Sequence, residues 1–171
     1  GTETVMRHRL ITCLGCLLLL LPAACSNYDF TVNDRVVYTP EPLFTDFDVP
    51  DPALRECIRA AINSNKVTVA SELSALECTN AGVETLAGLA TFTEIEQLTL
   101  SSNHIRDISE LAAITVLQVL YLDNNKVIDA VPLYQLPALT RVDLSANPEL
   151  RCPAAGGLFR VETVILPRHC R

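Results

Sequence analysis

The sequence predicts an α/β solenoid of about five turns, covered at its N-terminal end by a helix. Two observations predict this fold. An apolar triplet with the spacing L-x-x-L-x-L recurs five times at a constant interval of 22 residues, beginning at Leu73. An amphipathic helical pattern begins at Asp51, shortly before the first triplet. A constant period of this length is typical of solenoids, in which each repeat buries its apolar edge against the next.

Residues 1–24 have the layout of a secretory signal peptide. A small positively charged region, Met6 to Arg9, precedes an apolar block of fifteen residues from Leu10 to Ala24. Fifteen apolar positions are too few for an ordinary transmembrane helix. Met6 is the expected start, which leaves residues 1–5 upstream of the signal. The alternative is a buried helix, but nothing nearby would cover a cylinder that is apolar on all sides.

The run from Leu21 to Ser26 resembles the lipobox of bacterial lipoproteins, whose cysteine becomes the lipidated first residue of the mature protein. It departs from that pattern at Pro22, where a large aliphatic residue is usual. The resemblance implies lipidation of Cys25, with simple secretion as the alternative, and Ser26 implies sorting to the outer membrane. Each buried methylene adds about 0.8 kcal/mol, so several acyl chains would hold the domain firmly at a membrane. An outer-membrane lipoprotein of the cell envelope is therefore expected, on its periplasmic or its surface side.

Charge argues against two classes of partner. The chain has 20 acidic and 13 basic residues. Removal of residues 1–24 takes away Glu3, Arg7 and Arg9, which leaves 19 acidic against 11 basic residues and a net charge of −8. Nucleic acids and anionic lipid surfaces are bound by clustered Lys and Arg. Apart from the lipid anchor, neither is expected as a partner.

Four of the seven cysteines remain after Cys13 and Cys16 of the apolar block and Cys25 are set aside. An even number in an exported chain predicts two disulfides, for which three connectivities are possible. Buried free thiols and a metal site are the alternatives. A metal site would have only Cys152 and the adjacent pair His169-Cys170, and neighbouring ligands rarely both reach one ion. The four cysteines are Cys57, Cys78, Cys152 and Cys170.

Residues 25–50 are predicted to form a tether, because they carry acidic residues and three prolines and have no sustained helical periodicity. A linker seldom holds as many aromatic residues as this segment does, so part of it is expected to dock on the solenoid or on a partner. The aromatic residues are Tyr28, Phe30, Tyr38, Phe44 and Phe47.

Residues 51–72 are predicted to form an N-terminal helical cap. Asp51 is a suitable N-cap acceptor, and Pro52 fits the first helical position. Asn63-Ser64-Asn65 ends the helix. One apolar stripe follows the helical spacing: Leu54, Cys57, Ile58, Ala61 and Ile62.

Residues 73–171 contain the repeats and a C-terminal cap. The inward triplets begin with Leu73, Leu76 and Cys78 and recur as Ile95, Leu98 and Leu100; Leu117, Leu120 and Leu122; Leu139, Val142 and Leu144; and Val161, Val164 and Leu166. Three residues after three of these triplets comes an asparagine, namely Asn103, Asn125 and Asn147. Ala81 and His169 occupy that position in the first and last turns.

This pattern resembles the leucine-rich-repeat family in its 22-residue bacterial form, with an I-x-D-I-x-x-L return from Ile105 to Leu111. The resemblance extends from Leu73 to Leu166 and implies a right-handed coil with one short strand per turn. The asparagines are expected to form a structural ladder that satisfies buried backbone groups of their own and the adjacent coil. The fourth return departs from the period at Leu150, which indicates local remodelling near one end.

In such a solenoid the cysteines are placed to pair at its two ends. Cys78 takes an inward strand position in the first turn, facing the helix that bears Cys57. Cys170 closes the last strand and can reach Cys152. We therefore expect the disulfides Cys57–Cys78 and Cys152–Cys170.

The residues between the inward leucines are expected on the concave face of the strands. A partner-binding patch is predicted around Tyr121, because Tyr and Arg dominate interface energetics. The alternative is an ordinary solvated surface on which Arg141 pairs with Asp143. The predicted patch comprises Gln97, Thr99, Val119, Tyr121, Asp123, Arg141, Asp143 and Ile165.

Catalysis is not expected. The sequence places no serine or free thiol to partner His104 or His169, since His169 stands next to a cysteine expected in a disulfide, and no glycine-rich phosphate loop is present. Asp123 and Asp143 lack the further ligands of a calcium site, so no metal, cofactor or small-molecule substrate is expected. The leading hypothesis is a lipid-anchored adaptor or assembly factor that binds a protein partner. The alternatives are a secreted or surface-exposed recognition protein for a host protein or glycan, and a structural subunit of an envelope complex.

Overall fold

The computed structural model describes residues 30–32, 35–154 and 156–171. It divides into two units, Gly1–Glu41 and Pro42–Arg171. In the first unit, strands β1 (Phe30–Val32) and β2 (Arg35–Tyr38) pair as an antiparallel hairpin. The expected signal peptide and Cys25 lie outside the described residues. Across the described ranges, no helix is both long and apolar enough to span a membrane.

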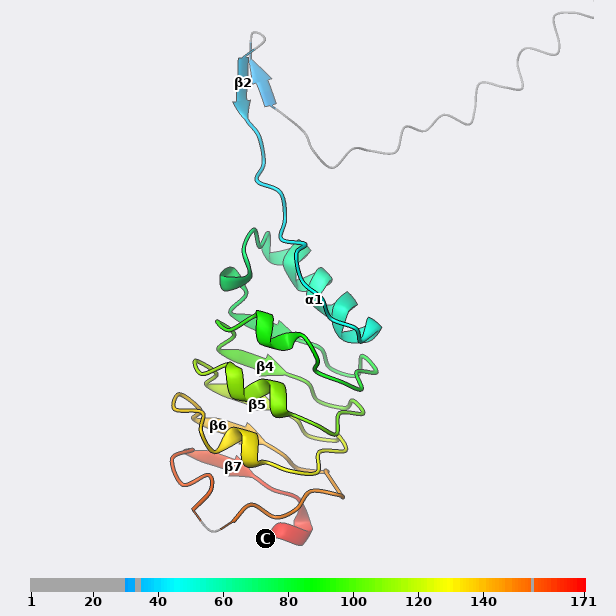
Figure 1. Cartoon of the computed structure of the whole chain (residues 1–171), viewed down its shortest axis with the longest axis vertical. Coiled ribbons are helices and arrows are strands. Elements are labelled where there is room, and N and C mark those ends of the chain that lie inside the picture. Colours follow the sequence, from blue (N-terminus) through cyan, green and yellow to red (C-terminus); the bar gives the residue numbers. More distant parts are fainter. Residues whose placement is uncertain (1–29, 33–34, 155) are drawn as a thin grey trace, which may run out of the picture. The chain divides into compact units, whose positions relative to one another are not determined.

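The second unit is an open solenoid built on a parallel sheet with the strand order β3-β4-β5-β6-β7 (Figure 1). The 22-residue period sets the register, because it brings the same position of successive repeats side by side; Leu76 pairs with Leu98, and Leu98 with Leu120. The predicted leucine-rich-repeat fold is thereby confirmed. The strands are β3 (Ala75–Glu77), β4 (Gln97–Thr99), β5 (Val119–Tyr121), β6 (Arg141–Asp143) and β7 (Thr163–Ile165).

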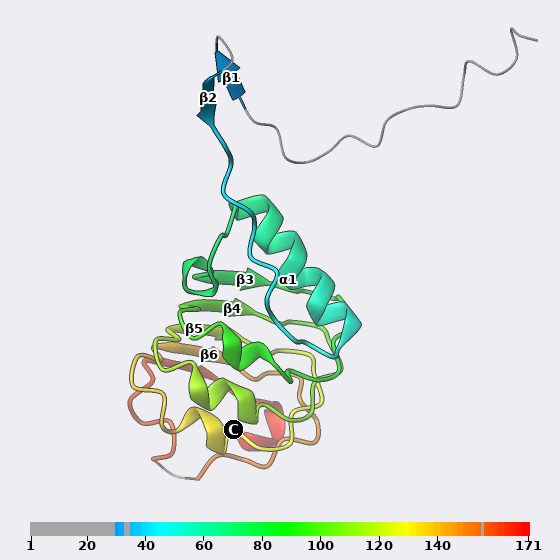
Figure 2. The same cartoon turned by 45° about the horizontal axis from the view of Figure 1, so that its top comes forward.

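Short 3-10 helices form the returns, on the side of the solenoid opposite the open face of the sheet (Figure 2). An aspartate stands two residues before each of two of these helices: Asp107 accepts a hydrogen bond from the Ser109 N–H, and Asp129 accepts one from the Val131 N–H, both at 2.8 Å. The aspartate of the I-x-D return therefore caps the 3-10 helix that follows it. The 3-10 helices are η1 (Ala70–Glu72), η2 (Leu89–Thr91), η3 (Ser109–Ala113), η4 (Val131–Leu133) and η5 (Arg168–Cys170).

The asparagine ladder lies inside the turns that follow the strands, where Asn103, Asn125 and Asn147 are buried. Asn147 shows the arrangement. Its Oδ1 accepts the Val127 N–H at 2.9 Å, and its Nδ2 donates to the carbonyls of Leu122 and Leu144, also at 2.9 Å. Each asparagine thus satisfies backbone groups in two successive coils, which would otherwise be buried without partners.

Helix α1 (Pro52–Asn65) covers the N-terminal end of the sheet (Figure 1). Asp51 caps it by accepting the N–H groups of Ala53 and Leu54 at 2.9 and 3.0 Å. Leu54, Ile58 and Ile62 form its buried face. Lys66, in the left-handed conformation at φ 57°, terminates the helix.

Residues 42–50, the last part of the expected tether, belong to the solenoid unit. The ring centroids of Phe44 and Phe47 lie 6.0 and 5.5 Å from that of Phe92, which is fully buried. Val49 is also buried, and the Phe44 N–H donates to the Val67 carbonyl at 2.9 Å. Burial of these apolar side chains holds the segment against the cap.

Both ends of the solenoid carry a disulfide. Cys57–Cys78 joins α1 to the residue after β3, and Cys152–Cys170 joins the fourth return to η5. These are the two pairs expected from the sequence. The C-terminal end is less well covered, because Val161, Val164 and Leu166 of the last rung are only partly buried.

Candidate functional site

The outward side chains of the five strands form a continuous surface, here called the sheet face. Residues on either side of each inward leucine alternate outward, and the strand register aligns them in two columns. The first column is Ala75, Gln97, Val119, Arg141 and Thr163; the second is Glu77, Thr99, Tyr121, Asp143 and Ile165. The structure therefore brings the predicted strand residues together on one surface.

Tyr121 lies at the middle of the second column, between Thr99 and Asp143. It is half-buried, as are Val119 on the same strand and Ile165 on β7. Arg141 is exposed beside Val119. Val119 precedes Tyr121 by two residues on β5, and Arg141 lies on the neighbouring strand β6.

Two carboxylates of the predicted patch have partners within the solenoid. Asp143 accepts the Ser145 N–H at 2.9 Å, and Asp123 accepts the Ser101 hydroxyl. Among the described residues Arg141 forms no ion pair with Asp143; the one ion pair found there joins Arg106 to Glu149. The alternative in which Arg141 pairs with Asp143 is therefore wrong. The Arg141 guanidinium forms no ion pair with any described residue.

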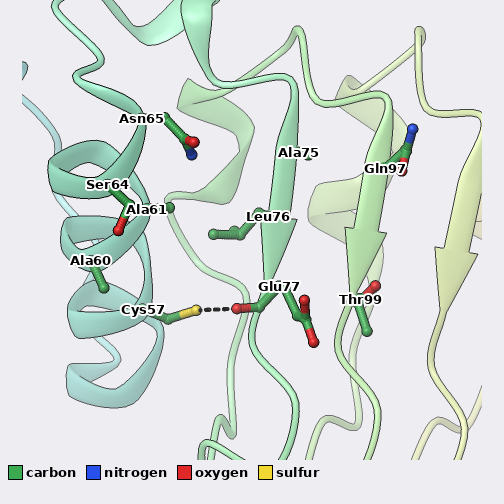
Figure 3. A pocket seen from close by; sticks show the side chains of 10 residues that line it. All are labelled: Cys57, Ala60, Ala61, Ser64, Asn65, Ala75, Leu76, Glu77, Gln97 and Thr99. Carbon is green, nitrogen blue, oxygen red and sulfur yellow. Dashed lines mark hydrogen bonds between the residues drawn. The ribbon is translucent and has the colours of Figure 1, made fainter.

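A groove of about 460 Å³ lies beside the sheet face, between α1 and β3 (Figure 3). Ala60, Ala61 and Ser64 form its helix wall, and Ala75 and Glu77 form part of its strand wall. The sequence did not predict this groove. Small residues at helical spacing were visible in the sequence, but the groove depends on how α1 is placed against β3.

Gln97 and Thr99, on the neighbouring strand β4, also line the groove, so it is continuous with the predicted patch. At its Cys57 end, the Cys57 sulfur lies 3.0 Å from the Glu77 carbonyl oxygen (dashed line in Figure 3). Because this sulfur is oxidised in the disulfide it carries no proton. We therefore interpret the contact as a sulfur–oxygen contact and not as a hydrogen bond.

The potential ligand atoms of Cys152, His169 and Cys170 lie within 4.8 Å of one another. The two sulfurs are joined in a disulfide, and a metal would require them as thiolates. A nitrogen of the His169 ring lies 2.8 Å from the Leu150 carbonyl oxygen, so Nε2 donates a hydrogen bond there. These three residues therefore form a structural closure of the last turn.

Comparisons with known proteins agree with this architecture. Two similar solved structures are an internalin (inlF) and an internalin C2 (inlC2), both from Listeria monocytogenes. The first has a TM-score of 0.60 and 27% identity over 70% of this chain; the second has 0.58 and 26% over 67%. The chain spans only 37% and 54% of those two proteins. No curated protein matches the sequence.

A family profile, the endo-β-N-acetylglucosaminidase EndoS LRR domain, matches residues 49–150. The match begins at buried Val49 and ends at buried Leu150, so it includes α1 and four of the five strands of the parallel sheet. The chain belongs to the family of the EndoS leucine-rich-repeat domain.

Proposed function

We propose that this chain is a non-catalytic protein-binding module of the bacterial cell envelope and that it binds its partner with the sheet face. The observation that carries the proposal is the half-buried Tyr121 at the centre of an aligned surface, with Val119, Ile165 and Arg141 around it. Aromatic and aliphatic groups would supply the desolvated centre of an interface, and Arg141 would supply a directional contact.

Photocrosslinking tests the proposed surface. A photoreactive amino acid introduced at Thr99, which neighbours Tyr121, should crosslink one protein partner in the native envelope. Tyr121→Ala in the same background should reduce the crosslinked yield at least about tenfold, since hot-spot truncations cost more than about 1.4 kcal/mol. Lys126→Ala, on an exposed turn away from the strands, is the matched control. Equal yield from the Tyr121→Ala and parent proteins would exclude the sheet face as the interface.

We further propose that the module is anchored through a lipid on Cys25 and acts as an adaptor or assembly factor. The resemblance of residues 21–26 to a lipobox supports the anchor, and the two disulfides support an oxidising compartment outside the cytoplasm. Metabolic palmitate labelling should be lost in Cys25→Ser. Unchanged labelling of that variant would refute the anchor without affecting the binding surface.

A recognition protein on the cell surface is the second candidate, favoured by the likeness to two internalins. Protease treatment of intact cells distinguishes the two functions. An adaptor that faces the periplasm should survive treatment of intact cells and be cleaved only after the outer membrane is opened. A surface receptor should be cleaved in both conditions.

A further inference from the structure

The groove between α1 and β3 contains an uncovered sheet edge. The register directs the N–H and C=O groups of Leu76 toward β4. The residues two before and two after Leu76 point the same way: the Ser74 carbonyl accepts the Gln97 N–H, and the Cys78 N–H donates to the Thr99 carbonyl. The backbone groups of Ala75 and Glu77 therefore point toward α1. The contact between the Glu77 carbonyl and Cys57 of α1 confirms this direction.

Within the described part of the chain, the Ala75 N–H, the Ala75 C=O and the Glu77 N–H have no hydrogen-bond partner. Ala75 and Glu77 are both exposed and both line the groove, so a segment bound there would lie along this edge. Across the groove, the alanines at 60 and 61 and Ser64 have side chains too short to fill the space (Figure 3). The groove thus combines backbone donors and an acceptor with room for a polypeptide segment.

The charge of the groove indicates which kind of side chain would bind in it. Glu77 is the one charged residue among those that line it, and its carboxylate forms no ion pair with any described residue. The other polar linings are Ser64, Asn65, Gln97 and Thr99, which are neutral. Ser64 and Asn65 lie in the last turn of α1, whose free carbonyls add partial negative charge. A cationic side chain is complementary to this combination.

We propose that the groove binds an extended peptide segment of the protein partner, with a lysine or arginine placed against Glu77 and a backbone amide paired with Ala75. The inference rests on the proposed binding role of the sheet face, which the groove adjoins through Gln97 and Thr99. The inference specifies that the partner presents a basic, extended segment, which the patch around Tyr121 does not indicate.

The test is an NMR titration of the isotope-labelled, disulfide-intact chain with a short peptide, acetyl-Gly-Ser-Lys-Ser-Gly-amide. The matched control peptide has glutamate in place of lysine. The lysine peptide should shift the amide signals of Ala75 and Glu77 and approach saturation at about 10 mM, within the range of weak but specific binding. The glutamate peptide should leave both signals in place.

Two variants test the walls of the groove. Glu77→Gln should weaken binding about threefold or more, because it removes the charge and keeps the size of the side chain. Glu84→Gln, on the exposed turn after β3, should not change it. A double substitution, Ala60→Leu with Ser64→Leu, should fill the groove and weaken binding at least about tenfold, while the good helix propensity of leucine keeps α1 intact.

The proposal is overturned if the lysine peptide produces no saturable shift at Ala75 and Glu77, or if Glu77→Gln binds it as well as the parent. Tyr121→Ala separates this inference from the proposed function. That variant should leave the peptide titration unchanged while it lowers the crosslinked yield of the whole partner. If the titration fails but the crosslink depends on Tyr121, only the groove proposal is refuted. If the peptide binds but the crosslink does not depend on Tyr121, only the proposed patch is refuted.

Discussion

Asp51 accepts a hydrogen bond from the backbone N–H of Thr85, a residue 34 positions away, at 3.0 Å. The same oxygen, Oδ2, accepts the Glu84 N–H at 2.8 Å, while Oδ1 caps α1 through Ala53 and Leu54. One buried carboxylate thus joins the N-terminus of the helix to the first return of the solenoid. Ala81 occupies the ladder position of the first repeat, and Asp51 supplies an acceptor to the return of this repeat from outside it.

Replacement of Asp51 should therefore destabilise both the helix and the first turn. We expect Asp51→Ala to lower the free energy of unfolding by about 2–4 kcal/mol, since it removes an N-cap and leaves two further N–H groups without an acceptor. Asp48→Asn, at an exposed position in the same segment, should change it by less than about 0.5 kcal/mol. Denaturant unfolding measures both, and equal stability of the two variants would contradict the double role of Asp51.

The same carboxylate makes stability depend on pH. Burial opposes ionisation of Asp51, but the four backbone N–H groups outweigh it and hold the pKa of Asp51 below its ordinary value of 3.8. In the unfolded chain Asp51 binds its proton near that ordinary value, so the unfolded state holds more protons in the interval between the two pKa values. The contribution of Asp51 is therefore present above about pH 4 and is lost as the pH falls through the lower, folded pKa.

Thermal unfolding from pH 6 down to pH 2 tests this dependence. The difference in Tm between the parent and Asp51→Asn should be constant above about pH 5 and should shrink below about pH 4. Asp48→Asn again serves as the control and should follow the parent. A difference that stays the same down to pH 2 would show that the charge of Asp51 does not contribute.

A pair of glycines tests whether residues 42–50 belong to the folded unit. Gly82 and Gly88 have the same positive φ of 85°. A Cβ at Gly82 would meet nothing within 4 Å, whereas one at Gly88 would overlap the carbonyl oxygen of Asp48. Gly82→Ala should cost about 1–2 kcal/mol from the left-handed conformation alone. Gly88→Ala should cost more and should also expose the segment to proteolysis.

Limited proteolysis followed by mass spectrometry reads out that difference. Cleavage between residues 42 and 50 should accelerate in Gly88→Ala and should stay at the parental rate in Gly82→Ala. Equal rates in both variants would mean that the close approach of Asp48 to Gly88 does not hold the segment in place.

The sequence was sufficient to predict the parts of this fold that are local or periodic. The pair Asp51-Pro52 marked the start of α1, and the 22-residue period predicted the register of Leu76 with Leu98 and the burial of Asn147. These features follow from short-range capping and from one repeated pattern. The surface around Tyr121 followed in the same way, because the alternation of a strand decides which residues point outward.

The sequence could not predict contacts between elements that do not repeat. Phe44 and Phe47 have no periodicity that links them to Phe92, so the sequence indicated that part of residues 25–50 docks but not which residue it contacts. The groove beside Glu77 was missed for a related reason. Its existence depends on the distance between α1 and β3, which no spacing of residues along the chain encodes.

The two disulfides close loops of similar length, with sequence separations of 21 and 18 residues, so chain entropy alone predicts about 3 kcal/mol for each. Their surroundings differ. Cys78 is buried at 2% exposure, whereas Cys152 is exposed. Cys57→Ala with Cys78→Ala should therefore cost about 1 kcal/mol more than Cys152→Ala with Cys170→Ala, because it also leaves a small void in the first rung.

Guanidinium unfolding of the two double variants under oxidising conditions measures this difference. The parent with both disulfides intact should be the most stable. The variant without Cys152 and Cys170 should be less stable, and the variant without Cys57 and Cys78 should be the least stable. If the C-terminal variant were the less stable of the two, the partly buried last rung would depend on its disulfide more than the first turn does. The C-terminal disulfide would then be the main closure of the solenoid, because no α-helix in the described part of the chain covers Val161, Val164 and Leu166 as α1 covers the first turn.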